Sequence, residues 1–234
     1  MKAMLRFLIF SVFLGLAGCM ADPDSSGITI FSENFDFSQS QHGWQHGFAE
    51  YPTGVDDSTY YELKYAYQPE PGGSNSIMLS GNNRSTELFM YIKRKLEGLS
   101  PNTVYTLTFN VSLFSDAQQG LTGTVAAGEN VFLKVGATAI EPKSLIDRNR
   151  YIMNIDKGSL DESGNDMIAI GNLSVPSGSY TQINRTNSTN MNSPFRVKSN
   201  SRGEIWLIVG TDSGSSGKTT LYYSKIYLTL SAAN

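Results

Sequence analysis

The stretch from residue 103 to 114 carries the pattern that most limits the possible fold. Every second residue there is apolar, and the residues between them are polar. The apolar positions are Tyr105, Leu107, Phe109, Val111 and Leu113. A period of two is typical of a β-strand with one buried face. The turn dipeptide Pro101-Asn102 precedes the stretch, which is therefore predicted to be a strand of a sheet that covers a core.

Similar short runs recur along most of the chain. We predict further strands at residues 28–37, 59–67, 75–80, 86–96, 130–138, 150–155, 167–173, 194–199, 203–211 and 219–231. Glycine-rich turns at 71–73 and 213–217 separate some of them, the polar stretch 183–193 indicates a loop, and no stretch has a convincing helical period. About eleven strands in one domain predict an all-β, two-sheet antiparallel jelly-roll sandwich, with a closed barrel as the alternative.

The last two predicted strands differ in how apolar residues are distributed over their two faces. In 203–211 the residues on both faces are apolar, because Trp206 and Ile208 alternate with the apolar residues around them. This pattern predicts either burial on both sides or an aromatic residue that faces a ligand. In 219–231 we expect Tyr222 to share one face with Ile226, Leu228 and Leu230.

The first residues have the three parts of an export signal. Lys2 and Arg6 precede an uncharged apolar run from Phe7 to Leu16, and this run is shorter than the roughly 20 residues that span a bilayer. The motif Leu16-Ala17-Gly18-Cys19 resembles the lipobox of bacterial lipoproteins, which implies cleavage before Cys19 and lipid attachment to it. The alternative is an ordinary cleaved signal with an incidental cysteine.

The N-terminal pattern predicts how the chain is divided. We expect a signal peptide at 1–18, a lipidated tether at 19–27 and a β-sandwich domain at 28–234. Lipid on Cys19 would hold the domain on a membrane of the cell envelope. Met20 follows the cysteine in place of the aspartate that favours retention in the inner membrane, so we expect the outer membrane.

Charge and cysteine content exclude several classes of protein. The chain has 18 basic and 21 acidic residues, for a net charge of −3, and its only cysteine is Cys19. Nucleic-acid binding would require a concentrated basic surface, so no nucleic-acid partner is expected. With Cys19 acylated, the domain would have no disulfide, no thiolate metal site and no cysteine nucleophile.

Three segments of the chain form a recognisable set. They are Glu-Asn-Phe-Asp-Phe at 33–37 with Gly43-Trp44 after it, the run 99–109, and the ending 220–228. Together they resemble carbohydrate-binding modules with the galactose-binding-like jelly-roll fold. The chain is also similar to a group of bacterial lipoproteins that share stretches such as 207–214. The first resemblance implies a jelly-roll domain with a glycan ligand.

The resemblance also bears on metal binding. Many of these modules hold a structural calcium ion between an acid of the first strand and an aspartate of the last. Asp36 matches the first acid, but Ser224-Lys225 stands where the second is needed. We therefore expect no cofactor and no metal ligand, and calcium remains as an alternative.

Aromatic residues crowd one region of the sequence, near the polar loop 81–85. Sugar rings stack on aromatic side chains, and amide or guanidinium groups bind their hydroxyls. The expected ligand-binding residues are Trp44, Tyr51, Tyr60, Tyr61, Asn82 and Arg84. The alternative for Trp44 and for half of the tyrosines is a place in the core.

The sequence has no clear catalytic motif. His42 and His46 are the only histidines, and no glutamate lies between them as in zinc proteases. No serine lies in Gly-x-Ser-x-Gly, and the acidic loop 156–166 has Asp166 where a calcium-binding EF-hand loop needs glycine. We expect no catalytic residues.

Together these patterns predict a lipid-anchored envelope protein with a non-catalytic domain that binds a glycan or another extracytoplasmic ligand. One alternative is a structural or assembly lipoprotein that contacts another envelope protein. A polysaccharide-active enzyme is the third hypothesis.

Overall fold

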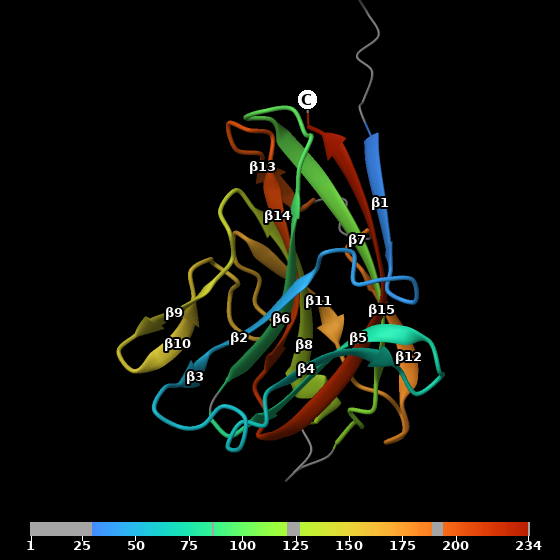
Figure 1. Cartoon of the computed structure of the whole chain (residues 1–234), viewed down its shortest axis with the longest axis vertical. Coiled ribbons are helices and arrows are strands. Elements are labelled where there is room, and N and C mark those ends of the chain that lie inside the picture. Colours follow the sequence, from blue (N-terminus) through green and yellow to red (C-terminus); the bar gives the residue numbers. More distant parts are fainter. Residues whose placement is uncertain (1–29, 86, 121–126, 189–193, 234) are drawn as a thin grey trace, which may run out of the picture.

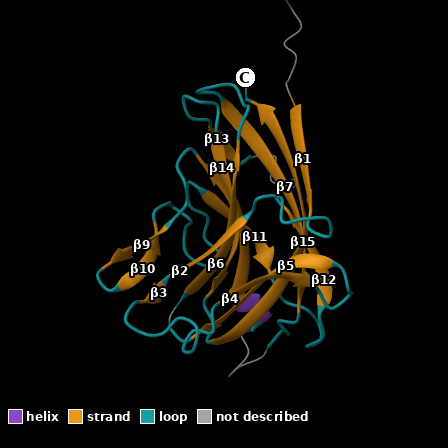
Figure 2. Cartoon of the chain, viewed as in Figure 1, coloured by secondary structure: helices purple, strands orange, loops and turns teal. Residues whose placement is uncertain are grey.

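The computed structural model describes residues 30–85, 87–120, 127–188 and 194–233. The predicted signal peptide, the tether and Cys19 lie outside these residues. Regular structure in the described part consists of β-strands and one short 3₁₀ helix, η1 (Gly128–Asn130) (Figure 2). No helix in this part is long and apolar enough to cross a bilayer. The predicted all-β class is confirmed.

The larger of the two main sheets has seven strands, in the order β12-β7-β15-β5-β4, with β1 beside β15 and β13 beside β7. Its strands are β1 (Ile30–Asp36), β4 (Lys64–Pro69), β5 (Asn75–Asn83), β7 (Val104–Ser115), β12 (Thr181–Thr186), β13 (Arg196–Lys198) and β15 (Gly217–Ala232). The long strand β15 crosses the whole molecule (Figure 1). It pairs with β5 through its first half and with β1 through its second half.

The smaller main sheet has five strands, in the order β11-β8-β14-β6-β2. They are β2 (Gln45–Ala49), β6 (Leu88–Leu96), β8 (Val131–Thr138), β11 (Met167–Asn172) and β14 (Ile205–Ser213). A third, minor sheet joins β3 (Tyr51–Pro52), β10 (Arg150–Met153) and β9 (Ser144–Asp147). All the paired strands are antiparallel.

The two main sheets form a jelly-roll sandwich around one hydrophobic core, as predicted. The alternating apolar face of β7 lies in this core, where Leu107, Phe109 and Val111 are buried. Leu207 and Val209 of β14 are buried opposite, from the inner face of the smaller sheet. Burial of apolar surface at about 25 cal/mol per Å² is the main stabilising contribution to such a fold.

The outer face of the smaller sheet is also covered. A second cluster of buried side chains lies there: Ala49, Phe89, Tyr91, Met153, Ile155, Met167 and Ile208. The segment 139–166, which includes the β9–β10 hairpin, contributes to this cover and is called the covering segment below. Burial on both sides of 203–211 is therefore confirmed for Ile208, whereas Trp206 is half-buried with the Lys93 ammonium 5.4 Å from its ring centroid.

A buried network of charges fixes the covering segment to the smaller sheet. The Lys157 ammonium lies 2.7 Å from Asp212 of β14 and 2.5 Å from Glu87, and Lys134 of β8 lies 3.5 Å from Asp212. The Lys134 ammonium also donates to the backbone oxygens of Lys157 and Glu162. Burial raises the pKa of Asp212 to about 6, although Lys157 opposes the shift.

The structure corrects several details of the predicted strands. Thr181–Thr186 was expected to lie largely in a loop, but it forms β12 because its backbone pairs with β7 while Ile183 enters the core. The short strands β2, β3 and β9 were not predicted, and residues 59–63 precede β4 instead of belonging to a strand.

Tyr222 lies on the opposite face from the one expected. The pairing of β15 with β7 shifts between Tyr223 and Lys225, so Ser224 is an extra residue in a β-bulge. Tyr223 is buried before the bulge and Ile226 is buried after it. The alternation therefore changes phase, and Tyr222 points out of the sandwich while Ile226, Leu228 and Leu230 point in.

Candidate functional site

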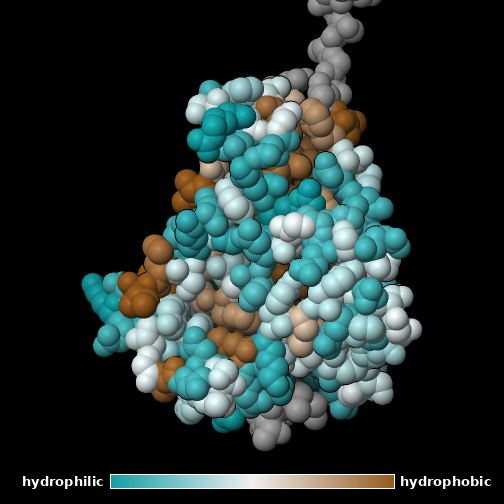
Figure 3. Space-filling model, viewed as in Figure 1, coloured by the Kyte–Doolittle hydropathy of each residue, from teal (hydrophilic) through white to brown (hydrophobic). Residues whose placement is uncertain are grey.

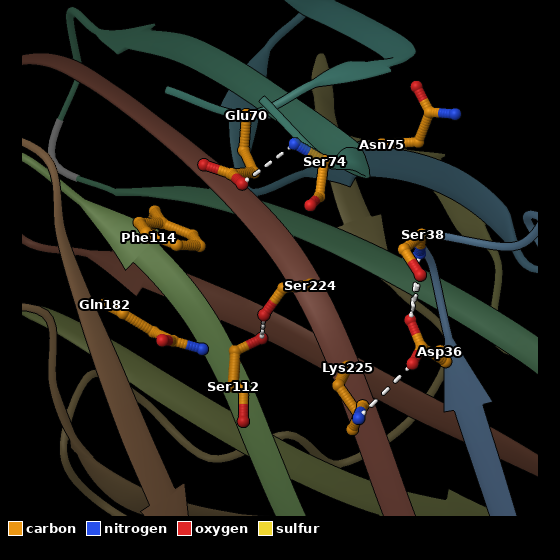
Figure 4. Close-up of a pocket in the computed structure, with 10 residues that line it drawn as sticks. All are labelled: Asp36, Ser38, Glu70, Ser74, Asn75, Ser112, Phe114, Gln182, Ser224 and Lys225. Carbon is orange, nitrogen blue, oxygen red and sulfur yellow. Dashed lines mark hydrogen bonds and ion pairs between the residues drawn. The ribbon is translucent and has the colours of Figure 1, made fainter. Parts of the chain in front are cut away.

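A groove of about 370 Å³ lies on the outer face of the larger sheet (Figure 4). It is called the outer groove here. Its lining residues are Asp36, Ser38, Glu70, Ser74, Asn75, Ser112, Phe114, Gln182, Ser224 and Lys225. Most of these side chains carry hydroxyl, amide or charged groups, and the aromatic ring among them is that of Phe114.

Strand alternation and the bulge place these side chains on the outer face. Leu113 of β7 is buried in the core, so its neighbours Ser112 and Phe114 face outwards. Gln182 of β12 lies directly opposite Phe114 in the sheet. The bulge lets Ser224 line the groove, and its hydroxyl donates to the Ser112 backbone oxygen at 3.0 Å.

Aromatic side chains flank the outer groove at one edge. Tyr222 of β15 lies opposite Phe114 in the sheet register, and its ring meets that of Tyr180 edge to face at 5.3 Å. Burial and the nearby Asp116 carboxylate raise the pKa of Tyr180. The Tyr180 hydroxyl therefore stays neutral and can both donate and accept hydrogen bonds.

An ion pair closes the opposite edge of the outer groove. The Asp36 carboxylate lies 3.3 Å from the Lys225 ammonium and accepts hydrogen bonds from the Ser38 hydroxyl at 2.7 Å and backbone N–H at 3.0 Å. Hydrogen bonds from Ser38, supported by Lys225, lower the pKa of Asp36. A lysine ammonium thus lies where the resemblance would place a second calcium-binding acid. Among the described residues, no group of three or more His, Cys, Asp or Glu side chains is placed to hold a metal ion.

Three of the expected ligand-binding residues belong to the core, and their predicted role is corrected. Trp44, Tyr51 and Tyr61 are 3 %, 4 % and 2 % exposed. The Trp44 ring packs edge-on against Phe35 at 5.4 Å, and the Tyr51 and Tyr61 rings lie 5.0 Å apart. A ring covered on both faces by protein atoms cannot stack on a ligand.

The other three expected residues come together on the surface. Tyr60 is 46 % exposed, and the Arg84 guanidinium lies 5.4 Å from its ring centroid. Arg84 Nε donates to the Tyr60 backbone oxygen at 2.7 Å. Asn82 Nδ2 donates to Glu62 at 2.8 Å, and Glu62 also pairs with Arg84 and Lys218. These five residues, Tyr60, Glu62, Asn82, Arg84 and Lys218, form what we call the Glu62 cluster.

The two histidines have separate structural surroundings. His42 lies in a turn with φ of 49°, and one of its ring nitrogens is 2.8 Å from the Asp36 backbone oxygen. The His46 ring stacks on Tyr65 with centroids 3.9 Å apart. Partial burial of its ring lowers the pKa of His46.

Sequence reasoning missed the outer groove and two members of the Glu62 cluster. The alternation in 103–114 could have placed Ser112 and Phe114 on the outer face, because they alternate with the core residues of the same strand. Ser224 and Tyr222 could not be assigned in this way, since the bulge that turns them outwards has no mark in the sequence.

No profile of a known protein family matches the chain, and no curated protein matches it. Among solved structures, the carbohydrate-binding module TmCBM61 in complex with β-1,4-galactotriose is 10 % identical, over 82 % of this chain and 92 % of that one, with a TM-score of 0.35. A putative sugar-binding protein from Bacteroides thetaiotaomicron is 8 % identical, over 85 % and 92 %, with a TM-score of 0.38. The K3 adhesin domain of Lys-gingipain from Porphyromonas gingivalis is 12 % identical, over 86 % and 99 %, with a TM-score of 0.38. The assignment of function therefore depends on the residues of the chain itself.

Proposed function

We propose that this protein binds a glycan, without catalysis, in the outer groove. The observation that carries the proposal is the lining of this groove, where hydroxyl and amide groups lie around the half-buried ring of Phe114. Phe114 supplies a ring for the apolar face of a sugar, and Gln182 and Asn75 supply amide donors and acceptors. Ligand sites of this kind combine an apolar surface with a few polar groups that set orientation.

The acid–base properties of the groove favour binding over catalysis. A glycosidase needs one carboxyl group that is protonated at the working pH and a second that is ionised. The pKa of Asp36 is lowered and its carboxylate is held by Ser38 and Lys225, so it is a poor proton donor near pH 7. Glu70, the other carboxylate of the lining, accepts hydrogen bonds from the backbone N–H groups of Gly72 and Ser74. Asp36 therefore serves to orient Lys225 and the loop at Ser38.

Lipid on Cys19 would place this domain at the cell envelope, with the outer membrane as the proposed location. Two or more acyl chains anchor a protein stably, whereas one chain binds only marginally. In this arrangement the outer groove would be separated from the lipid-bearing end of the chain by the length of β1. Asp36, which lines it, ends β1, and at about 3.3 Å per residue it lies about 20 Å from Ile30, where the strand begins.

A second candidate function is contact with another envelope protein. It is favoured by the β9–β10 hairpin, where Leu145 is 50 % and Ile146 is 66 % exposed. Hydrophobic atoms gather at this side of the molecule in Figure 3. Apolar side chains that remain exposed in this way are common in protein interfaces.

The test of the proposed function is a glycan-array screen of the purified full chain, followed by titration of the best oligosaccharide. Phe114→Ala and Gln182→Ala should each weaken binding by about tenfold, as for anchoring residues of other interfaces. The control is Leu145→Ala, which shortens an exposed side chain of the minor sheet and should leave affinity unchanged. Absence of any glycan binding at millimolar concentration would contradict the proposal and favour the protein-contact function.

A further inference from the structure

The Glu62 cluster and the outer groove lie on the same face of the same two strands. Asn82 of β5 pairs with Lys218 of β15. Because alternate residues of a strand face the same side of the sheet, these two residues lie on the same face as Met78 and Tyr222 farther along. Lys218 and Ser224 are about 20 Å apart along β15 at about 3.3 Å per residue. The groove and the cluster therefore lie toward opposite ends of one face of the sheet. The half-buried outer face of β15 between them is called the strip below, and beside it Met78 and Ser80 of β5 are 9 % and 3 % exposed.

Glu62 is the organising centre of its cluster. Its Oε1 accepts from Asn82 at 2.8 Å and lies 3.5 Å from Arg84 Nη2, and its Oε2 accepts from Lys218 Nζ at 2.8 Å. Hydrogen bonds from Lys218 and Asn82, together with the two positive charges, lower the pKa of Glu62 to about 2. Glu62 is thus ionised at any physiological pH, and both of its oxygens are occupied by its neighbours.

The cluster therefore presents more donors and positive charge than it uses internally. Two cations share the single carboxylate of Glu62. Arg84 has five N–H donors and Lys218 has three, yet their side chains remain 44 % and 40 % exposed. Lys64, on the neighbouring strand β4, adds a third exposed cation across from Ser80.

Among the described residues, no acid other than Glu62 forms an ion pair with Arg84 or Lys218. Asp56 accepts from the backbone N–H groups of Ser58 and Thr59 in its own loop. Asp57 accepts from the Tyr51 hydroxyl at 3.0 Å. The planar guanidinium, which lies against the exposed Tyr60 ring, matches the paired oxygens of a carboxylate or a sulfate.

We infer that the protein binds an extended, linear, acidic glycan along this strip, and that the Glu62 cluster recognises a carboxylate or sulfate group on a sugar unit beyond the outer groove. This inference rests on the proposed function and names its ligand class. The outer groove holds the sugar rings, and Arg84 with Lys218 selects for negative charge at the far end of the strip.

The test compares oligosaccharides that differ only in charge. The probes are hexagalacturonate and its fully methyl-esterified form, and a sulfated galactan hexamer and its desulfated form, each titrated against the purified full chain. At least one acidic probe should bind about tenfold more tightly than its neutral partner, and the acidic arm that responds identifies carboxylate or sulfate. Arg84→Gln and Lys218→Gln should each remove most of that preference for the acidic form.

The matched control is Lys143→Gln, which removes an exposed cation paired with Glu141 on the covering segment. Thermal unfolding of each variant checks the fold, since substitutions of exposed charges usually change stability little. If acidic and neutral forms bind equally, or if Arg84→Gln and Lys218→Gln leave the preference intact, the inference is wrong. The proposed function still stands in that case provided that Phe114→Ala weakens the neutral probe, and it fails with the inference if no glycan binds.

Discussion

Lys157 is the residue whose replacement tests the packing of the covering segment most severely. Its ammonium is almost fully buried and is the closest cation to both Asp212 and Glu87. Burial alone would lower the pKa of Lys157, but the two carboxylates outweigh it and hold this pKa above its usual value. Lys157→Met would leave two carboxylates with Lys134 as their remaining partner in the network, at 3.5 Å from Asp212.

Removing one partner of a buried ion pair costs about 3–5 kcal/mol, because the remaining charge is left uncompensated in the interior. This is a large part of the roughly 5–15 kcal/mol that stabilises a typical domain. A buried carboxylate without its cation has a pKa above its value in the unfolded chain, and burial already raises that of Asp212 to about 6 with Lys157 present. Such a group contributes fully to the stability of the fold at low pH. This contribution is lost as the pH rises through the pKa of the group in the folded state. The variant should therefore be less impaired at pH 5 than at pH 8.

Urea unfolding of the wild type and of Lys157→Met at both pH values measures this difference. The control is Lys225→Met, whose ion pair with Asp36 is partly exposed. This substitution should lower the free energy of unfolding by less than about 1 kcal/mol at either pH. A loss below about 1 kcal/mol for Lys157→Met at pH 8, or an equal loss at pH 5 and pH 8, would refute the reasoning.

Three further outcomes are expected. Cys19→Ser should move the protein out of the membrane fraction and abolish lipid mass, and a variant that stays bound while the wild type carries no lipid would contradict the anchor. Trp44→Ala should cost about 3–5 kcal/mol in urea unfolding, because the ring is a core element, and a loss below about 1 kcal/mol would contradict that role. Far-ultraviolet circular dichroism should show a β spectrum, and helix above about a fifth of the chain, against the usual third, would be inconsistent with the sandwich.

The fold class could be predicted because the core strands of this protein follow the simple alternation rule. The inner faces of β7 and β14 are continuous stripes, and their apolar residues are indeed buried. The missed strands β3 and β9 are short and lie outside the two main sheets, where pairing with a neighbour decides the structure more than local pattern does.

The candidate site could be predicted only in part, for physical reasons. Tyr60 and Tyr61 are adjacent and chemically alike, yet one is exposed and the other is buried against Tyr51. Sequence composition cannot distinguish such neighbours, because burial depends on which side of the loop meets the core. The partnership of Glu62 with Lys218 is equally invisible, since it joins loop and strand residues far apart in the chain.

The most direct test of the central claim is chemical-shift mapping of the backbone amides during titration with the best-binding oligosaccharide. If the outer groove is the binding site, the largest changes will fall on Ser112, Phe114, Gln182 and Ser224, on the outer face of the larger sheet. Changes confined to the covering segment, or no changes at millimolar ligand, would contradict the claim that this face binds the glycan.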